Sequence, residues 1–219
     1  MYKVFFTLVF LTVTVIANAQ DQKYNRKLYI RADVGGFIPV NKFKEEEDDH
    51  YITKKPKNGT VYNAGFGYII NSMWRGDLNF NYRNLRYKAS EEDGTFNTMK
   101  QKINMHSLFL NGYFDLNFHK TFKPYLKAGM GYSRNNSSTA LFYADGDLVE
   151  EFPGKKTNNF AWNIGAGIRI IFNDRFNLDF SYKYVDLGKV TTKSSDDGTI
   201  GRTFKVKFHD IMGGILVHL

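Results

Sequence analysis

Strict alternation of apolar and polar residues is the feature that most constrains this chain. Between residues 74 and 83, one parity carries Trp74, Leu78, Phe80 and Tyr82, and the other carries Arg75, Asp77, Asn79, Asn81 and Arg83. Successive side chains of a β-strand point to opposite faces, so this segment predicts a strand with one apolar face and one charged face. The segments 160–172 and 176–184 repeat the pattern.

The same period recurs along the chain and predicts an all-β protein. The expected strands are 28–37, 60–70, 74–88, 101–118, 122–135, 159–172, 176–188 and 203–219. The composition agrees, because 20 Phe, 14 Tyr and 19 Gly against only 4 Pro favour strands and tight turns over helices.

Short and long connections alternate between these strands. The short ones are 71–73, 119–121 and 173–175, and the long polar ones are 38–59, 89–100, 136–158 and 189–202. An up-and-down antiparallel barrel in an outer membrane has short periplasmic turns and longer outer loops. The sequence therefore predicts an eight-stranded transmembrane β-barrel with both termini in the periplasm.

The first residues predict a cleaved signal peptide. Lys3 precedes the apolar stretch 4–16, and Ala17 and Ala19 supply the small residues that a signal peptidase reads, so cleavage is expected before Gln20. The apolar stretch is too short to span a bilayer comfortably. The predicted domains are a signal peptide at 1–19 and an outer-membrane β-barrel at 20–219.

A soluble β-sandwich or a lipocalin-like barrel would show the same alternation with its faces reversed. Two observations favour the membrane. Strands such as 101–118 and 159–172 reach the length of about 9–11 residues that a transmembrane strand needs. Aromatic residues also flank the short turns, where an interfacial girdle is expected. These residues are Trp74, Phe118, Phe122, Phe172 and Phe176.

In a membrane barrel the polar parity faces the interior. The candidate inward charges are Arg31, Arg75, Arg83, Lys127, Arg169 and Lys183 with Asp33, Asp77, Asp115, Asp179 and Asp210. Their near balance predicts ion pairs that fill the barrel, since an eight-stranded barrel is just wide enough for side chains. The glycines at 129, 131, 165 and 167 are expected to make room for long neighbours. The alternative is a narrow porin-like channel for small solutes, whose ion selectivity Arg75 and Arg169 would set.

Several segments resemble the opacity-type, OmpA-like small outer-membrane β-barrel proteins, a surface-antigen family. They are PYLKAGMGY at 124–132, AWNIGAG at 161–167, LDFSYKYVDLG at 178–188 and His209-Asp210 before a glycine-bearing last strand. The resemblance implies an outer-membrane location, eight strands, adhesin roles in some members and no shared catalytic residues. Members commonly end in an aromatic residue that the barrel-assembly machinery reads, whereas this chain ends in Leu219.

No catalytic, cofactor or metal site is predicted, and the chain is not expected to be an enzyme. His209 lies beside Asp210, but adjacent strand residues point to opposite faces. The acidic run 45–50 lacks the glycine and the spaced ligands of a calcium loop. Gly165 and Gly167 precede no helix that would hold a phosphate.

The expected function is structural: a barrel that presents long polar loops for adhesion or interaction. Four loop aromatics could anchor a host or extracellular protein, namely Tyr51, Phe142, Tyr143 and Phe152. The net charge of +8 would attract the phosphates of outer-membrane lipid and lipopolysaccharide. The barrel-assembly machinery is a further expected partner, and nucleic acid is not, because an exported chain has little access to it.

Overall fold

The computed structural model describes residues 26–40, 58–89, 98–144, 147–191 and 203–219. The predicted signal peptide at 1–19 lies outside these residues. The strands are β1 (Leu28–Pro39), β2 (Gly59–Ile69), β3 (Trp74–Ala89), β4 (Thr98–Asp115), β5 (Phe122–Ser137), β6 (Ala140–Ala144), β7 (Asp147–Phe152), β8 (Lys156–Ile171), β9 (Phe176–Thr191) and β10 (Thr203–His218). No helix in the described ranges is long and apolar enough to cross a membrane.

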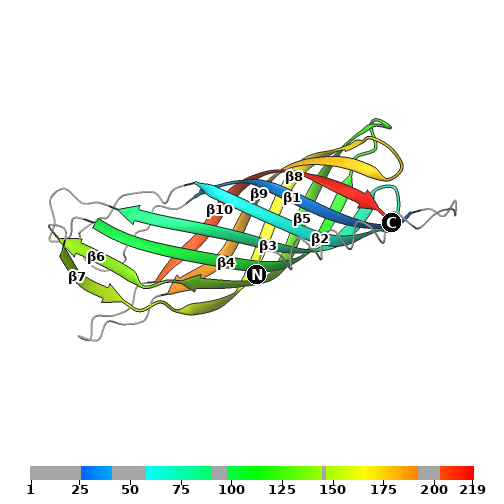
Figure 1. Cartoon of the computed structure of the whole chain (residues 1–219). Coiled ribbons are helices and arrows are strands. Elements are labelled where there is room, and N and C mark those ends of the chain that lie inside the picture. Colours follow the sequence, from blue (N-terminus) through cyan, green and yellow to red (C-terminus); the bar gives the residue numbers. More distant parts are fainter. Residues whose placement is uncertain (1–25, 41–57, 90–97, 145–146, 192–202) are drawn as a thin grey trace.

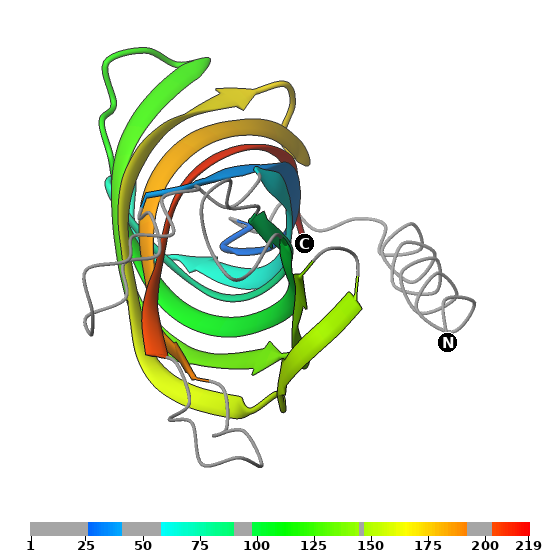
Figure 2. The same ribbon diagram turned by 90° about the vertical axis from the view of Figure 1, so that its left-hand side faces the viewer.

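Eight of the described strands close into an antiparallel barrel. The order β3-β2-β1-β10-β9-β8-β5-β4 is closed by the pairing of β3 with β4. Viewed from one end, these strands form a complete ring (Figure 2), and from the side they run obliquely to the long axis (Figure 1). The predicted strands and their antiparallel closure are therefore confirmed.

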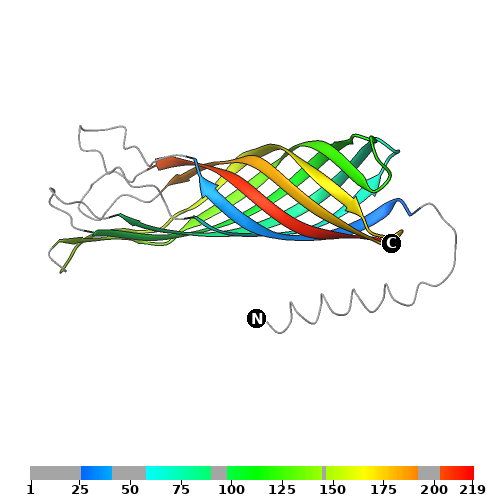
Figure 3. The same cartoon turned by 90° about the horizontal axis from the view of Figure 1, so that it is seen from above.

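Two of the three short connections are tight turns built on asparagine, and in the third the Thr121 N–H donates to His119 Nδ1 at 3.2 Å. The Oδ1 atom of Asn71 accepts hydrogen bonds from the backbone N–H groups of Met73 at 2.9 Å and Trp74 at 2.8 Å. Asn173 makes the equivalent bonds to the second and third residues after it, at 2.9 and 2.8 Å. An asparagine side chain that bonds its own downstream backbone substitutes for a backbone turn. These turns lie at the same end of the barrel as the C-terminus (Figure 3).

One long connection is not an unstructured loop. The predicted loop 136–158 contains the hairpin of β6 and β7, and β5 and β8 extend into it at either side. The outer end of β4 runs past its last pairing with β5, between Ile103 and Ser137, and pairs with β6 instead, from Thr98 to Lys100. The prediction of a plain loop was wrong because strands of five and six residues carry too few alternations to be read from sequence.

A β-bulge shapes the outer part of β9. The register against β10 shifts between Lys205 and Lys207, and Gly188 adopts a left-handed φ of 76°. Its N–H donates to the Asp186 carboxylate at 2.9 Å. The extra residue in a bulge breaks the strict alternation, and here it turns both Leu187 and Val190 toward the interior.

Candidate functional site

The outer wall of the short-turn half is covered by exposed apolar side chains. They include Leu78, Phe80, Leu108, Leu110, Leu126, Met130, Ile164, Phe180, Ile211 and Ile215. Soluble proteins rarely expose a contiguous apolar surface of this extent. Near the short turns Trp74 packs on Phe114, with ring centroids 4.9 Å apart. The apolar faces predicted from sequence therefore point outward, as a lipid-facing wall requires.

A second aromatic girdle closes this wall at its far edge. Its members are Tyr62, Tyr82, Tyr132, Phe160, Trp162, Tyr182 and Tyr184. Tyr62 is the cross-strand partner of Tyr82, Tyr132 is the partner of Phe160, and Trp162 lies 5.4 Å from the Tyr184 ring. Girdles at both edges of an apolar band mark the two interfaces of a membrane. The sequence analysis identified only the girdle at the short turns.

The interior of the short-turn half holds a charged network. All eleven predicted inward charges are buried. Arg31 donates to Asp33 at 2.7 Å and to Asp179 at 3.0 Å. Arg75 and Arg169 share the Asp115 carboxylate, at 3.1 Å and 2.7 Å. The predicted ion pairs inside the barrel are therefore present.

A second pairing group lies higher in the same interior. The Arg83 guanidinium contacts the Asp210 carboxylate, and Lys183 Nζ lies 3.6 Å from the same carboxylate. Lys183 also donates to Asn81 at 2.9 Å. The mutual attraction of these paired charges offsets part of the cost of removing them from water.

Three tyrosines complete the filling of this half. Arg75 lies over the ring of Tyr113, 3.9 Å from its centroid, and 4.7 Å from the centroid of Tyr125. Tyr29 donates to the Asp77 carboxylate at 3.3 Å. The sequence analysis did not single out Tyr29 or Tyr125. Their signal was their position on the polar parity of the first and fifth predicted strands.

Glycines make this filling possible. A Cβ at Gly129 would collide with Asn111 and Asn163, which hydrogen-bond each other at 2.9 Å across the interior. A Cβ at Gly167 would collide with the Tyr125 ring. The expectation that inward glycines make room for long neighbours is confirmed for Gly129 and Gly167, although the neighbours are these side chains rather than Arg169. At Gly131 and Gly165 a Cβ would instead meet the adjacent strand at its backbone or Cβ.

The network bears on the channel alternative. Arg75 and Arg169, the expected selectivity residues, are bound to one shared carboxylate and are no more than 4% exposed. In the described barrel, ten of the eleven inward charges form ion pairs with one another, and Lys127 Nζ lies 5.2 Å from the centroid of the Tyr113 ring. This arrangement favours a structural role for them over a transport path.

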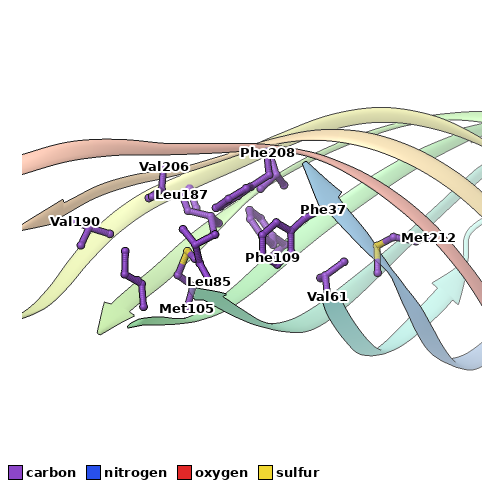
Figure 4. Close-up of a cluster of buried hydrophobic side chains, with 13 residues drawn as sticks. Phe37, Val61, Leu85, Met105, Phe109, Leu187, Val190, Val206, Phe208 and Met212 are labelled. Atoms are coloured by element: carbon purple, nitrogen blue, oxygen red, sulfur yellow. The ribbon is translucent and has the colours of Figure 1, made fainter. Parts of the chain in front are cut away.

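Beyond the second girdle the two faces of the barrel exchange their polarity. Many inward positions become apolar and form an outer cluster, whose residues are Phe37, Val61, Leu85, Ile103, Met105, Phe109, Ala161, Val185, Leu187, Val190, Val206, Phe208 and Met212 (Figure 4). The inward positions of β5 stay polar, with buried Ser133, Asn135 and Ser137. Phe37 and Phe208 meet edge to face, with centroids 4.9 Å apart. Outward positions on the same strands now carry polar residues such as Arg86, Lys102 and Lys207. The expectation of a polar interior is therefore wrong for most strands in this half.

The reason for the exchange is the solvent. Lipid surrounds the barrel below the second girdle, and apolar side chains face outward there. Water surrounds the barrel above it, so apolar side chains are stabilised inside, as in a soluble barrel. The membrane barrel and the soluble barrel, treated above as alternatives, are two halves of one molecule.

The loop aromatics have different environments. Phe152, at the end of β7, is 1% exposed, so it is not available to a partner and that prediction was wrong. Tyr143 on β6 is half-buried, with Lys100 Nζ 4.3 Å from its ring centroid. Tyr51, the side chain of Phe142 and the acidic run 45–50 lie outside what the structure describes.

His209 and Asp210 point to opposite faces, as expected. Asp210 is buried in the charged network, and His209 lies on the outer wall with Nδ1 2.6 Å from the Tyr182 hydroxyl. No group of three or more residues able to hold a metal occurs within the described ranges.

The sequence is similar to known outer-membrane proteins. Residues 6–209 match the family described as outer membrane protein beta-barrel domain. The chain is 33% identical to outer membrane protein PagN of Salmonella typhimurium over 42% of its length, and that alignment spans 38% of PagN. It is 27% identical to an adhesin candidate of Rickettsia conorii, over 90% of this chain and 84% of that protein.

A solved structure shares the fold. The crystal structure of Neisserial surface protein A superposes with a TM-score of 0.57 at 16% identity, covering 88% of this chain and 97% of that one. This likeness concerns the fold alone. With the family match over most of the sequence, the lipid-facing wall and the closed ring of strands, the chain belongs to the family of outer-membrane protein β-barrels.

Proposed function

We propose that this protein is a surface-display barrel whose outer end presents a binding surface for adhesion to another cell or protein. The observation that carries the proposal is the exchange of polarity beyond the second girdle. Strands that continue into water around an apolar core serve no purpose in crossing the membrane. They form a second part of the barrel that faces water and carries the outer connections. We call this part, which surrounds the outer cluster, the outer storey.

Rigidity of this storey supports a binding role. The long connections leave from strand ends at this level, and the outer cluster fixes those ends. The hairpin of β6 and β7 extends the sheet further, to the left in Figure 1. Holding a loop in place before it meets a partner lowers the entropy cost of binding. Relatives named as adhesin candidates agree with this role.

The hairpin is the part of the outer end best suited to a test. Leu141 and Glu151 are cross-strand partners, so residues 142–150 can be replaced by Asn-Gly, which favours a two-residue turn. This deletion spares the buried Ala140 and Phe152 at the base. It also avoids the ends of β5 and β8 that a deletion of 136–158 would remove.

The experiment expresses both forms in a non-adherent Gram-negative host and counts bacteria bound to cultured epithelial cells. We expect the full chain to confer adhesion and the shortened hairpin to lose most of it. Gel mobility with and without boiling verifies that each barrel is folded. Adhesion that survives the deletion would exclude the hairpin as the contact, and a folded full chain that confers no adhesion would refute the proposed function.

The proposal also includes the partners of the barrel in the membrane and a non-enzymatic role. We expect the barrel-assembly machinery to insert this chain and lipopolysaccharide to surround it on the outer side. A non-enzymatic role agrees with the outward His209, whose neighbour Tyr182 is not a catalytic nucleophile of the serine or cysteine type.

A further inference from the structure

One side of the outer storey carries a concentration of positive charge on its outward face. Five exposed cations lie there on β3, β4, β5 and β8, namely Arg86, Lys100, Lys102, Arg134 and Lys156. We call this set the basic face. These four strands are consecutive neighbours around the barrel, so the basic face is one continuous surface.

The strand register brings the cations close together. Arg86 and Lys102 are direct cross-strand partners, and Lys100 precedes Lys102 by two residues on the same face of β4. Strands lie about 4.8 Å apart and rise about 3.3 Å per residue, so neighbouring cations fall within reach of one phosphate-bearing headgroup. Asparagines lie on the same face between them, at 84, 104, 136 and 158, and offer neutral hydrogen-bond donors.

The described parts of the four strands that carry the basic face, β3, β4, β5 and β8, have no acidic side chain on their outward side. Glu151 on β7 is the nearest described carboxylate in register, since Leu141 pairs with both Glu151 and Lys100. The opposite wall differs, because Lys207 on β10 is paired with Asp186 on β9 at 3.2 Å. Like charges on adjacent strands repel, so an anion bound at this face would stabilise the arrangement.

The level of the basic face indicates which anion. Arg134 follows the girdle residue Tyr132 by two residues, and Arg86 follows Tyr82 by four. Aromatic girdles lie at the headgroup level of a membrane, and long cationic side chains beside them reach the headgroups. The cations therefore begin where the phosphates of the outer leaflet lie.

We propose that the basic face binds the phosphate groups of the outer-leaflet glycolipid and so fixes this side of the barrel against its lipid neighbours. Arg86 and Arg134 have the planar guanidinium that bonds two phosphate oxygens at once, and the lysines add point charges. The site is on the outer wall, so it is separate from the hairpin proposed for adhesion. It does not depend on that function.

The test titrates the full chain, folded in zwitterionic detergent micelles, with diphosphorylated lipid A and with the same lipid after removal of its phosphates. Variant Lys102→Gln/Arg134→Gln removes two charges of the basic face. The matched control, Lys189→Gln/Lys205→Gln, removes two exposed lysines that are cross-strand partners on the other wall. Gel mobility before and after boiling verifies folding of each form.

We expect the basic-face variant to bind diphosphorylated lipid A about 10-fold or more weakly, since each surface cation near an anionic lipid contributes about 1 kcal/mol. The control should bind as the parent chain does. The charge-retaining variant Lys102→Arg/Arg134→Lys should keep most of the affinity. Equal loss in the control, equal binding of dephosphorylated lipid, or an unchanged affinity in the basic-face variant would each overturn the proposal.

Discussion

Replacing Asp115 by asparagine should destabilise the barrel strongly without changing its shape. The carboxylate accepts from Arg75 Nε at 3.1 and 3.2 Å and from Arg169 Nη2 at 2.7 Å, and it is buried. Asparagine keeps one acceptor oxygen but removes the charge, which leaves two buried guanidinium groups beside a neutral amide. Breaking a buried pair in this way costs about 3–5 kcal/mol. Because one acceptor remains, we expect roughly 3 kcal/mol, a factor of about 100 in the folding equilibrium.

The assay is urea unfolding of the full chain in lipid vesicles, followed by the fluorescence of Trp74 and Trp162. Both indoles lie on the outer wall and leave the lipid on unfolding. Asp174→Asn, in an exposed turn, removes the same charge and is the control. A loss below about 1 kcal/mol at Asp115, within the range of an ordinary hydrogen bond, would show that the interior solvates the guanidinium groups. That result would refute the account of the charged network.

Three further experiments test the faces of the barrel. Leu110→Arg, in the middle of the lipid-facing wall, should lower the unfolding free energy in vesicles by about 2–4 kcal/mol. Asn158→Arg, above the second girdle, should lower it by less than about 1 kcal/mol. Equal losses would mean that the membrane boundary is misplaced. Gly129→Val should prevent folding, as judged by gel mobility with and without boiling, because its side chain would meet two interior asparagines. Gly112→Ala, where a Cβ meets nothing within 4 Å, should fold normally. Phe208→Ala should lower the unfolding free energy by about 3–5 kcal/mol, and a change below 1 kcal/mol would show that the outer cluster is not a packed core.

Most of the fold could be predicted from the alternation of apolar and polar side chains in the sequence. The alternation located the barrel strands to within a few residues, since β3 runs Trp74–Ala89 against a predicted 74–88. It also assigned all eleven inward charges to the correct face. Both successes have one cause: neighbouring side chains of a strand must point to opposite sides, so the pattern of side chains is local information.

The outer storey was missed for a reason that the same residues show. In β4 the inward residues change from Asn111 and Ser107 to Met105 and Ile103, while the parity stays constant. The sequence therefore contained the exchange of polarity, but only as a reversal within individual strands such as β4. The exchange of polarity can be recognised once the strand register is known, because the register places the reversals of neighbouring strands at the same height in the barrel.

Sequence alone determined the period, the closed up-and-down order and which residues share a face, because these follow from backbone geometry and from the lengths of adjacent connections. Only the tertiary structure decided which charges pair. Arg31 meets Asp179 and Arg83 meets Asp210 across the barrel, from positions more than a hundred residues apart. It alone placed Phe152 inside, joined β6 to the end of β4 and gathered the basic face on neighbouring strands. These outcomes depend on the register and curvature of the closed sheet, which set the distance between residues that no local pattern connects.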